Sequence, residues 1–271
     1  MQSFDSIIYF NGAVLVSLVA VFVITFLLGS IPWGLIISKA VFRKDLREEG
    51  SGNIGATNAV RTLGKAGGIA VFVLDFGKGL LSGFIGLWIA NYMMGQVTAG
   101  EAQYSMTVLF AGEGTAPYLA LALAGCTLGH IFSPWLKFKG GKGIAVAVGC
   151  IFVVYGPWLT LLELGIFIVV VALTRYISAG SLAAAVACPF VGLFRFWGDW
   201  FAVVVCALVG CVVIWAHRAN IRRLMHHEES RIGDKKKAAA AGVSAEPVQD
   251  SDATVDAEAN ADAGSDGGGA A

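Results

Sequence analysis

GSGNIGATNAVRTLGK, residues Gly50–Lys65, lies between two apolar stretches that are each long enough to cross a bilayer. This segment is rich in glycine and carries the cations Arg61 and Lys65. In the hydrocarbon layer, backbone of this composition would leave N–H and C=O groups unpaired, which costs several kcal/mol for each group. The segment is therefore predicted to lie at the water boundary or to line a polar cavity. Because small residues expose the backbone and the cations attract anions, it predicts an anion site in a membrane protein.

A second loop, KFKGGKG at Lys137–Gly143, has the same chemistry. Gly140 and Gly141 permit close approach to the backbone and a positive φ. Lys142 and Gly143 lead into an apolar stretch, where the free N–H groups of a helix N-terminus favour an anion. Two such loops in one chain predict a phosphate site. The second loop by itself is also compatible with a cationic cytoplasmic loop of no further purpose.

The composition is typical of a polytopic membrane protein. Hydrophobic residues make up 56% of the 271 residues and charged residues only 14%, against about 25% charged residues in soluble proteins. A transmembrane helix needs roughly 20 apolar residues, and on this basis we predict an all-α integral membrane protein with about seven transmembrane helices. The predicted spans are Ala13–Ser38, Ala66–Met94, Ser105–Leu128, Ile144–Tyr155, Trp158–Thr174, Leu182–Phe194 and Trp200–Trp215.

The cations predict how these spans are oriented. All but two of the 19 Lys and Arg residues fall on one side of such a topology, the exceptions being Lys78 and Arg195. Cations favour the cytoplasmic side, so the N-terminus is predicted outside and the C-terminus inside. Residues 1–231 are predicted to form one membrane domain, and residues 232–271, rich in Ala, Asp, Glu and Gly, a disordered cytoplasmic tail. No cation precedes the first apolar stretch, so no cleaved signal peptide is predicted.

Gly50–Gly55 formally matches the dinucleotide-binding pattern G-x-G-x-x-G, and Asp75 stands where that pattern places its ribose-binding acid. The pattern requires a preceding strand within a βαβ unit. Here an apolar span precedes the glycines and Asp75 falls inside another span, so a dinucleotide site is rejected. The physical part of the pattern survives, because a glycine-rich turn before a helix offers N–H groups to a phosphate.

Asp75 and Lys78 are charged residues within one predicted span. They are three residues apart, so they share a helix face and are able to pair. Charges at membrane depth commonly face a cavity or a partner, and a structural pair that supports the loops is an equally good interpretation. The five cysteines all lie in apolar stretches without metal-type spacing, which indicates small buried hydrophobic residues.

Two further polar groups fall on the predicted cytoplasmic side. Ser181 lies in TRYISAGS, between two spans, and His217 and Asn220 follow the last span at the same level. Together with the two glycine-rich loops, these groups are predicted to converge on one pocket. The chain contains no Ser-His-Asp set, C-x-x-C or H-E-x-x-H pattern that would indicate another chemistry.

Five motifs carry a resemblance to a known family. They are GSIPWGLIISK (Gly29–Lys39), GSGNIGATNAVRTLGK, GHIFSPWLKFKGGKG (Gly129–Gly143), TRYISAGS and HRANIRRL (His217–Leu224). From about Val21 to Arg231 the chain resembles the bacterial acyl-phosphate:glycerol-3-phosphate acyltransferases, the PlsY family. The resemblance implies a seven-span inner-membrane enzyme with a cytoplasm-facing site. It also implies transfer of a fatty acyl group from acyl phosphate to the 1-hydroxyl of glycerol 3-phosphate, giving lysophosphatidate and phosphate.

The resemblance also implies roles for individual residues. Acyl phosphate is already activated, so neither a cofactor nor a metal is expected. The expected partners are the two substrates and membrane lipids, not nucleic acid, and a monomer is compatible with the reaction. The base is left open between the substrate's own phosphate and His217. The implied catalytic residues are Ser51, Arg61, Lys142, Ser181, His217 and Asn220, and the implied phosphate-binding residues are Gly140, Gly141, Lys142, Gly143, Arg61 and Asn53.

Two other classes of protein were weighed against this interpretation. A phosphate transporter would also place cationic glycine-rich loops at the membrane, but it predicts broken spans repeated in two halves of the chain. The sequence has no convincing internal repeat, and its polar loops lie on one side. A structural or lipid-binding scaffold would not need two separate phosphate-type loops.

Overall fold

The computed structural model describes residues 12–97 and 114–233. These residues form helices and connecting loops, without a strand among them, which confirms the predicted all-α class. The helices are α1 (Gly12–Ser30), α2 (Trp33–Ala40), α3 (Ala56–Val97), α4 (Ala116–Ile131), α5 (Ile144–Val154), α6 (Pro157–Thr174), α7 (Ile177–Arg195), α8 (Trp200–Ala216) and α9 (Arg218–Met225), with a 3₁₀ turn, η3, at Pro134–Leu136.

The helices are those of a membrane protein. Within the described residues, five helical segments are long and apolar enough to span a bilayer, or six if α8 and α9 form one bent span. α5 has only 11 residues. Large apolar side chains such as Leu173 and Trp158 are exposed, as expected where lipid is the solvent. The count of seven spans and their orientation stay predictions. The predicted span Ser105–Leu128 begins outside the described residues.

The first predicted span, Ala13–Ser38, lies within one candidate span, Gly12–Ala40, but its helix is interrupted. α1 ends at Ser30 and α2 begins at Trp33, with Pro32 between them. Proline has no N–H to donate and its ring clashes with the preceding turn, so a helix stops or bends there. At the break the carbonyl of Ile31 accepts from the N–H of Trp33 at 3.1 Å, and its second lone pair is available to a partner from another helix.

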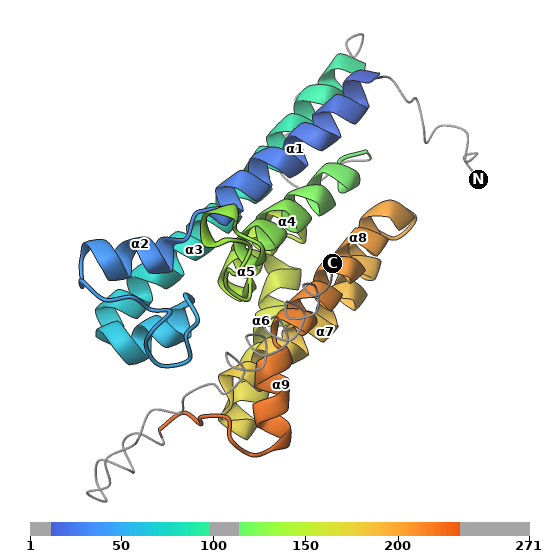
Figure 1. The fold of residues 1–271 in the computed structure, drawn as a ribbon. Helices are drawn as coiled ribbons and strands as arrows, with labels where there is room; N and C mark the ends of the chain where they lie inside the picture. The colour runs from blue at the N-terminus through green and yellow to red at the C-terminus, as the bar shows by residue number, and fades with distance from the viewer. Residues whose placement is uncertain (1–11, 98–113, 234–271) are drawn as a thin grey trace, which may run out of the picture.

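Gly50–Lys65, predicted as a continuous loop, is half helical. α3 begins at Ala56, and its only non-helical residue is Gly64, with φ of 82° and ψ of −177°. The first turns of α3, α2 and the intervening loop form a lobe at one end of the molecule (Figure 1). A small apolar core of four buried side chains holds this lobe together: Ile37, Leu46, Ala59 and Val71.

Several pairs of helices approach each other closely because a glycine lies at the contact. A Cβ on Gly79 of α3 would stand 1.9 Å from the carbonyl oxygen of Val146, and one on Gly149 of α5 would stand 2.0 Å from that of Phe76. A Cβ on Gly129 of α4 would stand 2.1 Å from the carbonyl oxygen of Phe26 in α1. Small residues that let backbones approach are a common packing device between membrane helices.

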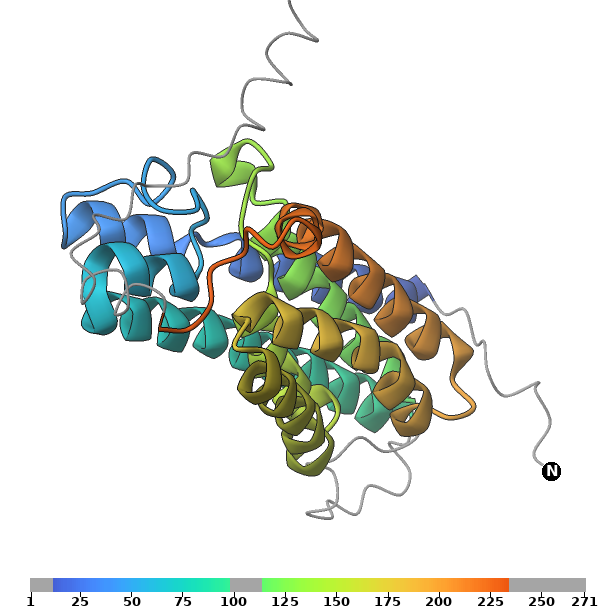
Figure 2. The same ribbon diagram turned by 90° about the horizontal axis from the view of Figure 1, so that it is seen from below.

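α4 is the most buried of the candidate spans, and it packs against α1, α3, α5 and α8. α6, α7 and α8 lie side by side on the other side of α4 from α1 (Figure 2). The α2 lobe and α9 lie toward the end of the molecule opposite to the beginnings of α1 and α8 (Figure 1). The predicted polar segments therefore share one end of the bundle.

Candidate active site

Asn58, near the start of α3, holds the first glycine-rich loop in shape. Its Nδ2 donates to the backbone carbonyls of Leu46, Glu49 and Asn53 at 2.8–3.0 Å. Its Oδ1 accepts from the backbone N–H of Ser51 at 3.0 Å. Asn58 was not predicted as a site residue, although a buried amide beside a glycine-rich loop was the available signal. Its bonds place Ser51, which is a predicted catalytic residue.

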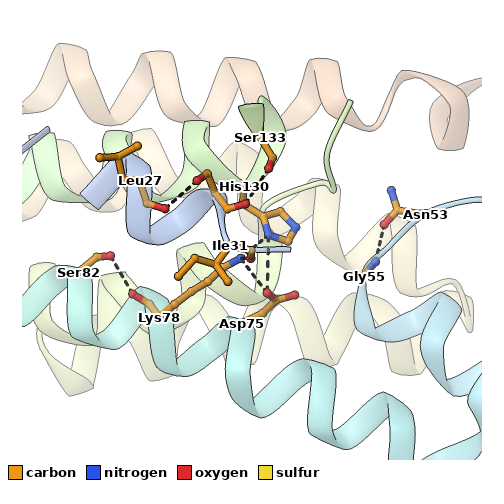
Figure 3. Close-up of polar contacts among 10 residues, drawn as sticks. Leu27, Ile31, Asn53, Gly55, Asp75, Lys78, Ser82, His130 and Ser133 are labelled. Atoms are coloured by element: carbon orange, nitrogen blue, oxygen red, sulfur yellow. Dashed lines mark hydrogen bonds and ion pairs between the residues drawn. The ribbon is translucent and has the colours of Figure 1, made fainter. Parts of the chain in front are cut away.

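The other predicted residues of this loop have different surroundings. The side-chain oxygen of Asn53 accepts from the N–H of Gly55 at 2.9 Å (Figure 3). That oxygen is occupied within the loop, which leaves the amide NH₂ as the group suited to a phosphate. Arg61 is exposed on α3, and no carboxylate among the described residues lies within ion-pair distance of Arg61 or Lys65.

Three cations that precede this loop in the chain are already paired with carboxylates. The Arg47 guanidinium donates two hydrogen bonds to Asp45, at 2.7 and 3.0 Å, and Lys39 lies 3.0 Å from the same carboxylate. Hydrogen bonds from Arg47, with a further one from Lys39, hold the pKa of Asp45 well below its usual range. Lys44 lies 3.4 Å from Glu49. The loop cations that remain for an anionic ligand therefore include Arg61.

The second loop folds back onto the end of α4. The N–H groups of Gly140 and Gly141 donate to the carbonyls of Ile131 and His130 at 2.9 and 3.0 Å. A Cβ on Gly140 would stand 2.1 Å from the His130 carbonyl oxygen, and one on Gly141 would stand 2.1 Å from the imidazole Nε2. Both glycines therefore pack closely against the end of α4. The positive φ expected at these glycines is found instead at Lys137, Phe138 and Gly143, with φ of 53°, 62° and 83°.

A buried polar network lies directly beneath this turn. Lys78 Nζ lies 2.9 Å from Asp75 Oδ1, donates to the Ile31 carbonyl at 2.8 Å and donates to His130 Nδ1 at 3.0 Å (Figure 3). The predicted pairing of Asp75 with Lys78 is confirmed. Neither the third member, His130, nor the Ile31 carbonyl at the proline break was predicted. The network joins the α1–α2 break, α3 and the glycine turn.

Another contact fixes the loop to α1. The Ser133 hydroxyl donates to the Ser30 carbonyl at 2.7 Å, and the Trp135 indole donates to the Ser30 hydroxyl at 2.9 Å. Both bonds use polar groups at the end of α1, where carbonyls have no helical partner. The turn that carries Lys142 is thus held from two sides.

His217 lies buried at the junction of α8 and α9. Its Nδ1 is 2.8 Å from the carbonyl oxygen of Val213. A carbonyl only accepts, so Nδ1 carries a proton and Nε2 of the neutral ring is an acceptor. The approach of His217 to Lys142 in one site stays a prediction.

Ser181 and Asn220 are buried near the same end of the bundle. The Ser181 hydroxyl donates to the carbonyl of Ile177 at 3.1 Å. Asn220 Nδ2 donates to Glu229 at 3.0 Å, and the other oxygen of Glu229 accepts from Arg223 at 2.8 Å. Burial acts to raise the pKa of Glu229, but the hydrogen bonds from Arg223 and Asn220 outweigh it and lower that pKa.

Because its pKa is lowered, Glu229 is ionised at neutral pH, and this sets the sign of its pH dependence. Its contacts stabilise the fold above the pKa of an unperturbed glutamate and lose that contribution as the pH falls through the lowered value. Glu229 was not predicted as a site residue. Glu229 lies outside the five motifs that carry the family resemblance, and it comes close to Asn220 only when the chain folds.

Among the described residues, the hydrogen bonds of His217 and Asn220 go to Val213 and Glu229 and not to Ser51 or Arg61 of the first loop. Convergence of all the predicted residues on one pocket therefore stays a prediction.

Comparison with known proteins points to one family. Its sequence model, described as glycerol-3-phosphate acyltransferase, matches residues 19–227. The glycerol-3-phosphate acyltransferase of Thermosynechococcus vestitus is 37% identical over 221 residues, which cover 82% of this chain and 97% of that protein. The protein of the same name from Listeria monocytogenes is 35% identical and covers 80% of this chain and 98% of its own length.

Two crystal structures of PlsY (YgiH), an integral membrane glycerol 3-phosphate acyltransferase, have a similar fold at 30% sequence identity. The glycerol 3-phosphate form has a TM-score of 0.65 and covers 81% of this chain and 98% of that chain. The lysophosphatidic acid form has a TM-score of 0.61 and covers 80% and 96%. The resemblance carried by the sequence motifs is confirmed, and the chain belongs to the PlsY-type glycerol-3-phosphate acyltransferase family.

Proposed function

We propose that this protein transfers a fatty acyl group from acyl phosphate to the 1-hydroxyl of sn-glycerol 3-phosphate at the cytoplasmic face of a bacterial inner membrane. The products are lysophosphatidate and inorganic phosphate, as in the first acylation of phospholipid biosynthesis. The observation that carries the proposal is the glycine turn Gly140–Gly143, which packs against the end of α4 and leads into the N-terminus of α5. A relative of the same fold has been crystallised in a glycerol 3-phosphate form and a lysophosphatidic acid form.

The proposed reaction needs residues that bind and neutralise anionic substrates. The 1-hydroxyl oxygen attacks the acyl carbonyl, an ester C–O bond forms, and the C–O bond to phosphate breaks. Acyl phosphate is a mixed anhydride, so its phosphate leaves without a covalent enzyme intermediate, a cofactor or a metal. The protein has to hold two anionic substrates in register and offset their charge, which is a matter of positioning and electrostatics.

Each phosphate is assigned to one loop. We place the phosphate of acyl phosphate at Gly140–Gly143, where Lys142 supplies a charge and the start of α5 supplies free N–H groups. We place the glycerol 3-phosphate phosphate at Arg61, because a guanidinium binds two oxygens at once. Asn53, Ser51 and Ser181 are assigned hydrogen bonds to the substrates.

The hydroxyl proton has two candidate acceptors, the phosphate of glycerol 3-phosphate and Nε2 of His217. The Val213 carbonyl keeps the proton of the neutral ring on Nδ1 and leaves Nε2 as an acceptor. His217→Gln removes that acceptor, and kcat is expected to fall about 10²-fold or more, the usual contribution of a general base. The measurement is turnover at saturating substrates. Near-normal turnover would leave the substrate phosphate as the proton acceptor.

The proposed donor is tested with purified full-length protein in detergent or vesicles. Acyl phosphate and glycerol 3-phosphate are expected to give lysophosphatidate and phosphate in equal amounts, in the presence of a chelator and without coenzyme A. Turnover with acyl-CoA but not with acyl phosphate would overturn the donor. Phosphate uptake into sealed vesicles without acyl transfer would favour a transporter.

A further inference from the structure

A short strap, residues Glu229–Gly233, runs from α9 back to the turn between α6 and α7. The N–H of Ile232 donates to the Arg175 carbonyl at 2.9 Å, and the Arg175 guanidinium donates to the Ile232 carbonyl. Arg231 Nε donates to the Tyr176 hydroxyl at 2.8 Å, and its guanidinium lies 5.0 Å from the centre of the same ring. The strap therefore ties α9 to the segment that leads into Ser181.

Glu229 is the strap residue that faces the proposed active site. Its two carboxylate oxygens have different partners, the Asn220 amide at 3.0 Å and the Arg223 guanidinium at 2.8 Å. The Glu229 side chain is only 9% exposed. By contrast, its neighbour Glu228 is exposed. Glu229 also lies beyond residues 19–227, the part of the chain that the family model covers.

The carboxylate decides which way the Asn220 amide points. An ionised carboxylate accepts hydrogen bonds and donates none, so it selects the NH₂ end of the amide. The Oδ1 end must then point away from Glu229. That oxygen is buried, and no described residue donates a hydrogen bond to it. A buried acceptor without a donor is costly, so its orientation is maintained by Glu229 and Arg223.

We propose that Glu229 is a positioning residue, which holds Asn220 so that its Oδ1 accepts a hydrogen bond from a hydroxyl of glycerol 3-phosphate. The inference rests on the proposed function for the identity of that substrate. The hydroxyl groups are the donors that glycerol 3-phosphate carries in its fully ionised form, and Oδ1 is a buried acceptor. Arg223 supports this role of Glu229, because the ion pair between them favours the ionised form of the carboxylate, which only accepts hydrogen bonds.

Glu229→Gln tests this proposal, because the new amide is able to donate to Oδ1 and so permits the reversed orientation of Asn220. The value of kcat/KM for glycerol 3-phosphate is expected to fall tenfold or more, while KM for acyl phosphate stays within twofold. Glu228→Gln removes the adjacent exposed charge and is expected to match the wild type. Equal kinetics for the two variants and the wild type would overturn the proposal.

A double-mutant cycle separates positioning from general stabilisation. If Glu229 acts through Asn220, Glu229→Gln causes no further loss in the Asn220→Ala background. Independent effects that multiply would overturn the proposal. Where turnover of Asn220→Ala is too low to measure, the dissociation constant for glycerol 3-phosphate, measured by calorimetry, completes the cycle.

Two controls keep the result interpretable. If Glu229→Gln lowers the melting temperature, Glu229→Asp, which keeps an acceptor-only carboxylate, is expected to restore KM for glycerol 3-phosphate. Failure of that rescue would also overturn the proposal. A wild-type protein that neither binds nor acylates glycerol 3-phosphate would contradict the proposed function itself. Wild-type activity with an unchanged Glu229→Gln variant would contradict only the positioning role.

Discussion

Lys78→Met is expected to lower the free energy of unfolding by about 3–5 kcal/mol, the usual result of leaving one partner of a buried ion pair alone. Lys78 and Asp75 are each 2% exposed as side chains and lie 2.9 Å apart. The ammonium group also donates hydrogen bonds to the Ile31 carbonyl and to His130 Nδ1. Methionine fills much of the same volume but offers no donor. The measurement is unfolding of the purified protein in detergent micelles.

The double variant Asp75→Asn with Lys78→Met is the matched test of this explanation. It removes the uncompensated carboxylate charge, so it is expected to regain a large part of the lost stability. Some loss should persist, because the Ile31 carbonyl and His130 Nδ1 each still lose the hydrogen bond that Lys78 donates. A Lys78→Met protein as stable as the wild type would show that the pair contributes nothing to the fold.

Gly140→Ala is expected to reduce kcat/KM for acyl phosphate about 100-fold, since a displacement of about 1 Å at a reacting group costs that much. The added Cβ would lie 2.1 Å from the His130 carbonyl oxygen and 2.8 Å from that of Ile131. Both obstacles are backbone atoms at the end of α4, so the turn must move instead. That movement displaces Lys142, which lies two residues further along the same loop.

Gly77→Ala provides the control for this substitution. Gly77 also lies in a candidate membrane span, on α3, but a Cβ at this position would have no neighbouring side-chain or backbone atom within 4 Å. Activity is expected to stay within about twofold, with stability unchanged or raised by up to about 1 kcal/mol because alanine is the better helix former. Equal losses for Gly140→Ala and Gly77→Ala would show that the close approach at the turn does not matter.

The sequence predicted a large part of the fold because membrane helices follow local rules. Each must satisfy its own backbone in lipid, so long apolar stretches marked most of the described spans. The predicted pairing of Asp75 with Lys78 was correct for a similar reason, because residues three apart on a helix are neighbours. Helix ends were less predictable, as the break at Pro32 and the helical start of α3 show.

Contacts between distant segments were not predictable in the same way. His130 is 52 residues from Lys78, and Glu229 reaches Asn220 only because the chain reverses after α9. No periodicity or local motif reports such a contact, since each depends on how the helices pack. Gly140 shows the same limit, because its need for glycine comes from the carbonyl of His130 and not from its own φ.

By itself, the sequence determined that this is an all-helical membrane protein with two cationic glycine-rich segments, and its motifs indicated the family. Hydrophobic length and composition suffice for that, because they act within each segment. The tertiary structure decided which polar atoms are already paired and which are left for a ligand. It turned the Asn220 amide toward Glu229. Hydrogen bonds and ion pairs act over a few ångströms, so their partners are settled only when the helices have packed.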